Sequence, residues 1–201
     1  MTESKSDDGS IRRRQPAAGL PRRTWFLVVV AFSAFWVIYM SLLGPRPRAP
    51  KLDGSGGGQA SYTWTLLDLK DRPVSFALFR GKTVFLNIWA TWCPPCLREM
   101  PSIARLAEEP RLKDKRIAFV CVATDESSDA VRTFLEGRSW SMSFFRATGV
   151  PGAFYSEGVP VTFIIAPDGR IAAVKDGPAD WDSPEVIALL EKLAAEAPAS
   201  P

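Results

Sequence analysis

The residues with the clearest chemical capacity are two cysteines three positions apart, Cys93 and Cys96. An apolar run before them predicts a buried strand, and the pattern after them predicts a helix, so the pair stands where a strand passes into a helix. The free N–H groups and dipole of a helix N-terminus stabilise a thiolate, and in such motifs the cysteine pKa falls from ~8.5 to between ~3.5 and ~7.5. Pro94 and Pro95 fit this place, because the first helical turn needs no N–H donor.

The two cysteines are predicted to have different roles. We expect Cys93 to be exposed and nucleophilic, and Cys96 to be shielded one turn into the helix. This arrangement suits attack on a disulfide, formation of a mixed disulfide and its resolution by the second thiol. A purely structural bridge between residues three apart would close almost no loop and add little stability. Cys121, the remaining cysteine, lies in an apolar run, where we expect a small core residue.

The composition narrows the classes of function. The 201 residues include no histidine, which excludes His-dependent nucleophilic catalysis, His general acid–base catalysis and His-ligated zinc. Three cysteines are too few for a four-ligand zinc site or a disulfide scaffold. Residues 1–51 hold nine basic and three acidic residues, and the rest of the chain holds 16 basic and 19 acidic ones. The globular part is mildly acidic and shows no basic patch of the kind that binds nucleic acid.

Residues 25–43 form a run of 19 residues without a charge. As a helix this run would be about 28 Å long, close to the ~30 Å hydrocarbon core of a membrane. A cleaved signal peptide would have a shorter apolar region, of ~7–15 residues, and an A-x-A-like end. We therefore expect an uncleaved transmembrane anchor at 25–43.

Flanking charges predict the direction of this anchor. More arginines precede the apolar run than follow it, which places residues 1–24 in the cytoplasm and the large domain outside. The predicted location is the inner (cytoplasmic) membrane, single-pass, with the C-terminal domain in the periplasm or at the cell exterior. Residues 44–60 are rich in Pro and Gly and are predicted to be a linker.

The pattern from residue 61 onward predicts an α/β domain. A short hairpin is expected around a turn at 68–72, and two strands that are apolar on both faces are expected within a covered parallel sheet. Ser183 as N-cap and Pro184 at the first helical position start the last helix. The predicted strands are 62–67, 73–76, 83–90, 116–123, 160–166 and 170–174, and the predicted helices are 94–108, 128–136 and one from 184 onward. The element order gives a mixed central sheet with helices on both faces.

The chain resembles the thioredoxin superfamily and, within it, the TlpA/ResA-like branch of membrane-anchored periplasmic thiol–disulfide oxidoreductases. The resemblance rests on residues 81–101 (GKTVFLNIWATWCPPCLREMP) and 158–165 (GVPVTFII), and it covers about residues 62–195. It implies a thioredoxin-like domain at 61–197, followed by a tail at 198–201. It also implies a kink of the active-site helix at Pro101 and an insertion in the 63 residues between Cys96 and Pro160.

The same resemblance implies further site residues. Val159 and Pro160 match the family's cis-proline loop, which faces the cysteine pair and binds the substrate strand. Glu99 matches an acid that affects cysteine reactivity in ResA-like proteins, whereas the buried Asp of thioredoxin itself is replaced here by Asn87. Beside the cysteines, Trp92, Pro94 and Pro95 are expected at the substrate-binding surface.

The implied activity is reduction of protein disulfides without a cofactor or metal. The Pro-Pro dipeptide carries no cation to stabilise a thiolate, and strong oxidants rely on such stabilisation. The resemblance implies a DsbD/CcdA-type membrane electron donor, with cysteine pairs of apocytochrome c or of copper sites as substrates.

Other functions are weighed against this one. An oxidase or isomerase of secreted proteins is the main alternative. A thioredoxin-fold peroxidase would need a Pro-x-x-x-Thr-x-x-Cys motif, and a copper-binding assembly factor would need a His. The sequence contains neither. A redox-inactive binding module conflicts with the presence of both cysteines.

Overall fold

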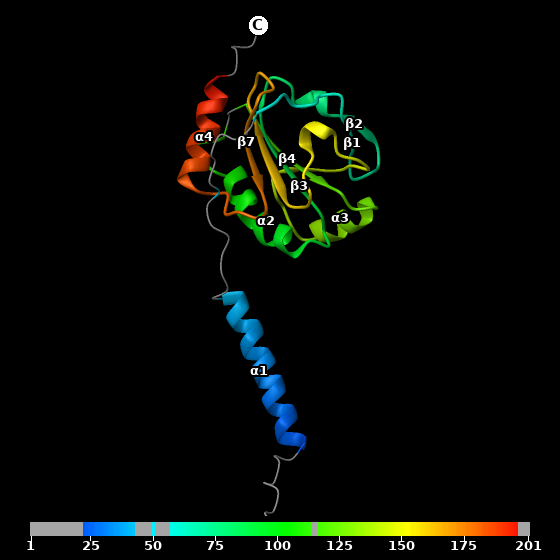
Figure 1. The fold of residues 1–201 in the computed structure, drawn as a ribbon, viewed down its shortest axis with the longest axis vertical. Coiled ribbons are helices and arrows are strands. Elements are labelled where there is room, and N and C mark those ends of the chain that lie inside the picture. The colour runs from blue at the N-terminus through cyan, green and yellow to red at the C-terminus, as the bar shows by residue number, and fades with distance from the viewer. Residues whose placement is uncertain (1–21, 43–49, 51–56, 114–115, 197–201) are drawn as a thin grey trace, which may run out of the picture. The chain divides into compact units, whose positions relative to one another are not determined.

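The computed structural model describes residues 22–42, 50, 57–113 and 116–196 (Figure 1). The chain divides into two units, Met1–Pro45 and Arg46–Pro201. In the first unit, helix α1 spans Arg22–Leu42. Within the described ranges, no helix is both long and apolar enough to cross a membrane. Most of the predicted tail at 1–24 and of the linker at 44–60, and all of the tail at 198–201, lie outside these ranges.

A seven-stranded mixed sheet forms the centre of the second unit, in the order β2-β1-β5-β4-β3-β6-β7 (Figure 1). Strands β3, β4 and β5 are parallel, whereas β6 and β7 on one side and β1 and β2 on the other pair antiparallel. The strands are β1 Thr65–Leu67, β2 Pro73–Ser75, β3 Thr83–Trp89, β4 Ile117–Ala123, β5 Ser143–Arg146, β6 Val161–Ile165 and β7 Ile171–Asp176. The predicted thioredoxin-like α/β fold with a mixed sheet is confirmed, and β5 is a strand that the sequence pattern did not reveal.

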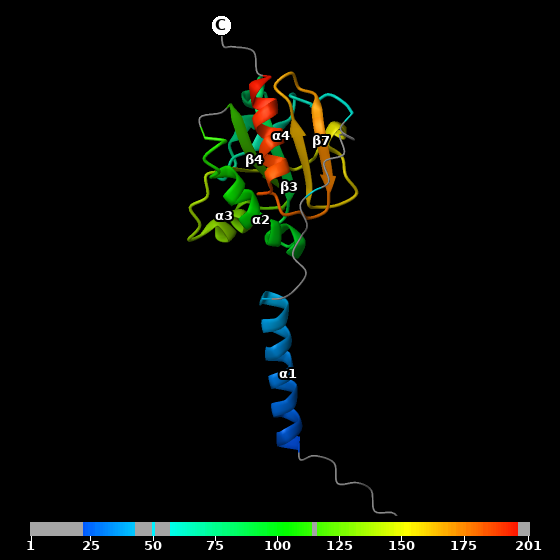
Figure 2. The same ribbon diagram turned by 90° about the vertical axis from the view of Figure 1, so that its left-hand side faces the viewer.

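Three α-helices pack on one face of this sheet. They are α2 Pro94–Ala107, α3 Ser128–Leu135 and α4 Pro184–Ala195. Their buried side chains, such as Ile103, Val131 and Leu190, join one apolar cluster with Phe85 and Trp89 of β3. Figure 2 shows α4 and α2 lying over this face. Ser183 caps α4, as predicted, by accepting a hydrogen bond from the Val186 N–H.

The opposite face is covered without an α-helix in the part of the domain that the structure describes. Two 3-10 helices, η1 Phe76–Phe79 and η2 Gly152–Phe154, contribute aromatic rings to a second apolar cluster. Tyr62 and Trp64 lie before the hairpin. Tyr62 stacks on Phe76 with ring centroids 5.6 Å apart, and Trp64 packs against Phe76 in a tilted arrangement at 5.7 Å. The expectation of α-helices on both faces was therefore wrong, because aromatic side chains of short segments exclude water from this face.

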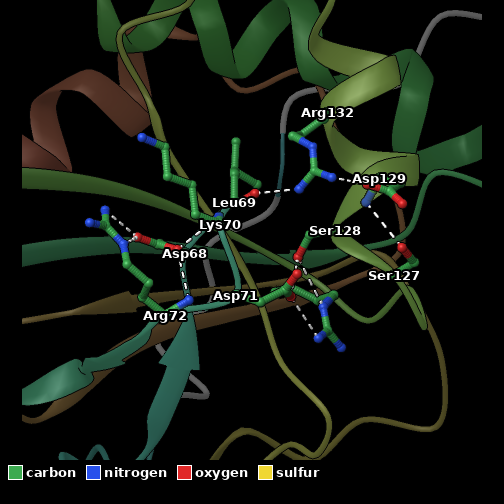
Figure 3. A network of polar contacts seen from close by, with 10 residues as sticks. Asp68, Leu69, Lys70, Asp71, Arg72, Ser127, Ser128, Asp129 and Arg132 are labelled. Atoms are coloured by element: carbon green, nitrogen blue, oxygen red, sulfur yellow. Dashed lines mark hydrogen bonds and ion pairs between the residues drawn. The ribbon is translucent and has the colours of Figure 1, made fainter.

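Polar contacts join the β1–β2 hairpin to α3 (Figure 3). Asp71, in the hairpin turn with φ 58°, accepts hydrogen bonds from Ser128 Oγ at 2.7 Å and Arg146 Nη2 at 2.9 Å. These contacts lower the pKa of Asp71 below its ordinary value, with the Ser128 bond as the largest cause. Arg132 donates to the Leu69 carbonyl at 2.5 Å. The hairpin is thus fixed by side chains, since only Leu67 and Arg146 pair between β1 and β5.

Candidate active site

The cysteine pair lies where β3 passes into α2, as the sequence predicted. Cys93 is the N-cap of α2 and forms a disulfide with Cys96, with Cα atoms 5.3 Å apart. The Cys96 N–H points at Cys93 Sγ at a distance of 3.2 Å, and the Cys93 N–H donates to the Ala90 carbonyl at 3.2 Å. Pro94 and Pro95 occupy the first helical turn, where their missing donors leave no hydrogen bond unmade. Pro101 lies inside α2.

The cis-proline loop lies against this disulfide. The Val159–Pro160 peptide bond is cis, as the resemblance implied, and the Val159 carbonyl lies 3.6 Å from Cys93 Sγ. Cys93 is only 4% exposed, so the expectation that it is exposed was wrong for this oxidised state. Its sulfur is bonded to Cys96 and packed against Val159, which leaves little of it open to solvent.

One exposed aromatic ring adjoins the disulfide in the chain, and another lies at the cis-proline loop. Trp92, directly before Cys93, is 69% exposed, and Tyr155, four residues before Val159, is 72% exposed. An open groove of about 610 Å³ runs along the cis-proline loop and is lined by Tyr155, Ser156, Glu157, Gly158, Val159, Pro160, Asp176 and Gly177. Pro160 is itself buried and contributes to the wall of this groove. Of the predicted substrate-binding residues, Val159 and Pro160 line this groove, while Trp92, Pro94 and Pro95 lie beside the two cysteines in the chain.

Glu99 of α2 is buried, with 1% of its area exposed. Its carboxylate accepts hydrogen bonds from Asn87 Nδ2 at 2.9 Å, from the Ala179 N–H at 3.0 Å and from Trp181 Nε1 at 3.0 Å. Burial raises the pKa of Glu99 above its ordinary value, and the three hydrogen bonds and the charge of Lys175 oppose this rise. Glu99 therefore joins α2 to β3 and to the segment after β7.

A row of polar and sulfur-bearing side chains crosses the sheet below Glu99. Asn87 of β3 pairs with Cys121 of β4 on one side and with Thr162 of β6 on the other. Asn87 Nδ2 also donates to Thr162 Oγ1 at 2.9 Å, while the buried Asn87 Oδ1 has no hydrogen-bond partner among the described residues. Thr162 was missed by the sequence analysis, although a threonine in a fully buried strand is itself a signal. Burial raises the pKa of the Cys121 thiol, which matches its expected role as a core residue.

A second carboxylate that the sequence analysis missed is Asp125, which lies two residues after β4 and is 5% exposed. It accepts hydrogen bonds from the backbone and the hydroxyl of Thr91, two residues before Cys93. Thr91 and Asp125 are 34 positions apart in the sequence, so no local pattern reveals this contact.

Comparison with known proteins identifies relatives of this chain. The Redoxin family model matches residues 53–190. The thiol–disulfide oxidoreductase ResA of Bacillus subtilis is 30% identical over 157 residues, which cover 77% of this chain and 83% of that protein. ResA of Bacillus cereus is 29% identical over 116 residues, covering 57% of this chain and 66% of that protein.

Solved structures agree on the fold. A thiol:disulfide interchange protein of the thioredoxin family from Chlorobium tepidum superimposes with a TM-score of 0.56 at 24% identity. The match covers 67% of this chain and 97% of that one. With the disulfide and the cis-proline loop in place, the extent of these matches shows that the chain belongs to the Redoxin family.

Proposed function

We propose that this chain is a thiol–disulfide oxidoreductase that reduces disulfides of protein substrates. The observation that carries the proposal is the Cys93–Cys96 disulfide at the start of α2, with the carbonyl of Val159 3.6 Å from Cys93 Sγ. The relatives named thiol–disulfide oxidoreductase ResA support the same chemistry.

The reaction uses only the two cysteines. In the reduced chain, the Cys93 thiolate attacks one sulfur of the substrate disulfide and forms a mixed disulfide, and the other substrate sulfur leaves and takes up a proton. The Cys96 thiolate then attacks Cys93 Sγ, forms the intramolecular disulfide and releases the second substrate thiol. Two electrons pass to the substrate, so a dithiol donor must reduce the pair before the next cycle, and no cofactor takes part.

Two features favour reduction over oxidation. Pro94 and Pro95 offer neither a cation nor an N–H donor to the Cys93 thiolate, whereas a strong oxidant such as DsbA holds its reduced form stable. Glu99 on the same helix contributes a carboxyl rather than a cation. Oxidation or isomerisation of secreted proteins is the second candidate.

Protein substrates fit the open surface around the site. Val159, Pro160 and Tyr155 line the groove, and Trp92, next to Cys93 in the chain, is also exposed. Rings that are apolar on their faces and polar at one edge suit contact with a peptide segment. Cysteine pairs of apocytochrome c or of copper sites are the substrates that the resemblance to the TlpA/ResA-like branch suggests.

The chain is further proposed to be anchored in the inner membrane with its domain outside. The support is the uncharged run at 25–43, the excess of arginines before it, and helix α1, whose side chains from Trp25 to Tyr39 include many exposed apolar ones. A DsbD/CcdA-type membrane protein would then supply electrons. Alkaline phosphatase fused after Pro201 should be active in cells, and an inactive fusion would refute this orientation.

The reduction potential tests the direction of exchange. Equilibration of the full chain with glutathione or dithiothreitol should give a potential nearer to thioredoxin's ~−270 mV than to DsbA's ~−120 mV. The Cys93→Ser variant serves as the inactive control. A potential above ~−180 mV would favour the oxidase or isomerase function instead.

A further inference from the structure

We infer that Asp125 is a positioning residue that holds the turn carrying the nucleophile Cys93 through its hydrogen bonds to Thr91. This inference rests on the proposed function and assigns a role in it to two residues outside the cysteine motif.

The contacts between Asp125 and Thr91 are direct and paired. The Thr91 N–H donates to Asp125 Oδ2 at 3.0 Å and to Oδ1 at 3.3 Å, and the Thr91 hydroxyl donates to Oδ1 as well. Hydrogen bonds to an ionised carboxylate are about twice as strong as those between neutral groups. Because Asp125 is 5% exposed, water competes little for these bonds.

The backbone next to Asp125 holds the same segment at a second point. The Thr124 N–H donates to the Trp89 carbonyl at 2.9 Å, and the Thr124 hydroxyl lies 3.3 Å from the same oxygen. This contact continues the parallel pairing of β3 with β4, in which Trp89 pairs with Ala123. The two residues after β4 therefore bind Trp89 and Thr91, on both sides of Ala90.

Thr91 belongs to the turn that carries the nucleophile Cys93. The Cys93 N–H donates to the Ala90 carbonyl, so Thr91 and Trp92 are the two central residues of a turn from Ala90 to Cys93. The position of this turn sets the place of Cys93 Sγ, which lies 3.2 Å from the Cys96 N–H and 3.6 Å from the Val159 carbonyl. Among the described residues, Thr91 is the one central residue of the turn that is hydrogen-bonded to the Asp125 side chain.

Positioning of this kind acts on reactivity. Thiol–disulfide exchange requires the attacking sulfur to approach along the substrate S–S bond, and small displacements of a reacting atom can lower a rate on the order of a hundredfold. A loosened turn would also move the Cys93 thiolate away from the Cys96 N–H that stabilises it. Loss of the hydrogen bonds between Asp125 and Thr91, called the clamp from here on, should therefore slow exchange and move thiolate formation to higher pH.

Two substitutions of Thr91 separate the clamp from the fold. Thr91→Val keeps the shape but removes the hydroxyl, and Thr91→Ser keeps the hydroxyl. In the reduced full chain we expect Thr91→Val to lower the rate of reduction of a disulfide-bonded protein roughly tenfold. The pH at which half of Cys93 reacts with iodoacetamide should rise. Thr91→Ser should restore both values toward those of the wild type.

Asp125→Asn provides an independent variant, because an amide has one acceptor oxygen instead of two. It should slow exchange as Thr91→Val does. Asp71→Asn is the matched control, because it weakens a similar carboxylate contact in the β1–β2 hairpin and should change neither the rate nor the alkylation profile.

Several results would overturn the inference. One is a Thr91→Val variant that melts at a lower temperature but keeps the wild-type rate and alkylation profile, which would show a purely structural contact. Another is a Thr91→Ser variant whose reduction rate and alkylation profile match those of Thr91→Val. The alkylation measurement needs no protein substrate, so it tests the clamp even if the wild-type chain reduces no disulfide, a result that would refute the proposed function alone.

Discussion

Removal of the Glu99 carboxylate should destabilise the domain far more than removal of an exposed acid. Glu99→Ala leaves three buried N–H groups without an acceptor: the Ala179 N–H, Trp181 Nε1–H and the one N–H of Asn87 Nδ2 that does not donate to Thr162. Each buried unsatisfied donor costs about 1–3 kcal/mol, and the three are coupled through one carboxylate and do not add fully. We expect the free energy of unfolding to fall by about 3 kcal/mol or more.

Glu99→Gln should be much milder, for a reason found in Asn87. The Gln oxygen can accept from Ala179 and Trp181, and its NH₂ group then faces Asn87. Rotation of the Asn87 amide by a half turn would present Oδ1, which has no partner in the structure, to residue 99 and to the Thr162 hydroxyl. The rotated Nδ2 takes the unpartnered place of Oδ1, so we expect a loss of about 1–2 kcal/mol, smaller than for Glu99→Ala.

Urea unfolding of the full chain, followed by tryptophan fluorescence, measures both effects. Trp181 is a suitable reporter because it packs edge-on against Phe85 with ring centroids 4.9 Å apart. Glu136→Ala, at an exposed residue after α3, is the control. A Glu99→Ala variant as stable as the control would refute the account of three dependent donors, and a Glu99→Gln variant as unstable as Glu99→Ala would refute the rotation of Asn87.

Three further predictions concern pH, the cysteines and the groove. Because the folded chain holds the proton of Glu99 more tightly than the unfolded chain, stability should be highest below the ordinary Glu pKa and fall as pH rises through the raised folded value. Glu99→Gln should abolish this slope in unfolding measured at several pH values, and a slope that persists would assign it to another group. Cys96→Ser should trap mixed disulfides through Cys93, seen by mass spectrometry, whereas Cys93→Ser should trap none, and adducts at Cys121 would contradict these roles. Tyr155→Ala should raise KM several-fold for a disulfide-bonded protein but leave the reduction of a small aromatic disulfide unchanged, and equal effects on both would remove Tyr155 from substrate binding.

The sequence was most informative where one local pattern decides the structure. The apolar run before Cys93 predicted β3, and the two prolines after it predicted the start of α2. The hairpin was likewise predicted, because turn-forming residues at 68–72 stand between two short apolar segments. The cis bond before Pro160 followed from resemblance alone, since an X–Pro dipeptide by itself allows either isomer.

The sequence was least informative where distant segments meet. Strand β5 is four residues long and only partly buried, so its pattern was too weak to stand out. Glu99 looks like an ordinary helical acid until Ala179 and Trp181, about 80 residues further on, are seen to donate to it. The burial of Cys93 depends in the same way on Val159, which the fold brings against it.

The full burial of Cys121 in the central strand β4 affects how the disulfide is kept correctly paired. Three cysteines allow three pairings, and any exchange among them needs a thiolate within reach of a sulfur. Burial disfavours the thiolate of Cys121 and shields its sulfur from an attacking thiolate. Mispairing is therefore confined to unfolded molecules, in which the short loop between Cys93 and Cys96 closes at the lowest entropic cost. The fold thus acts as a kinetic barrier against scrambling, and the rate of mispairing in an oxidising compartment should follow the rate of global unfolding.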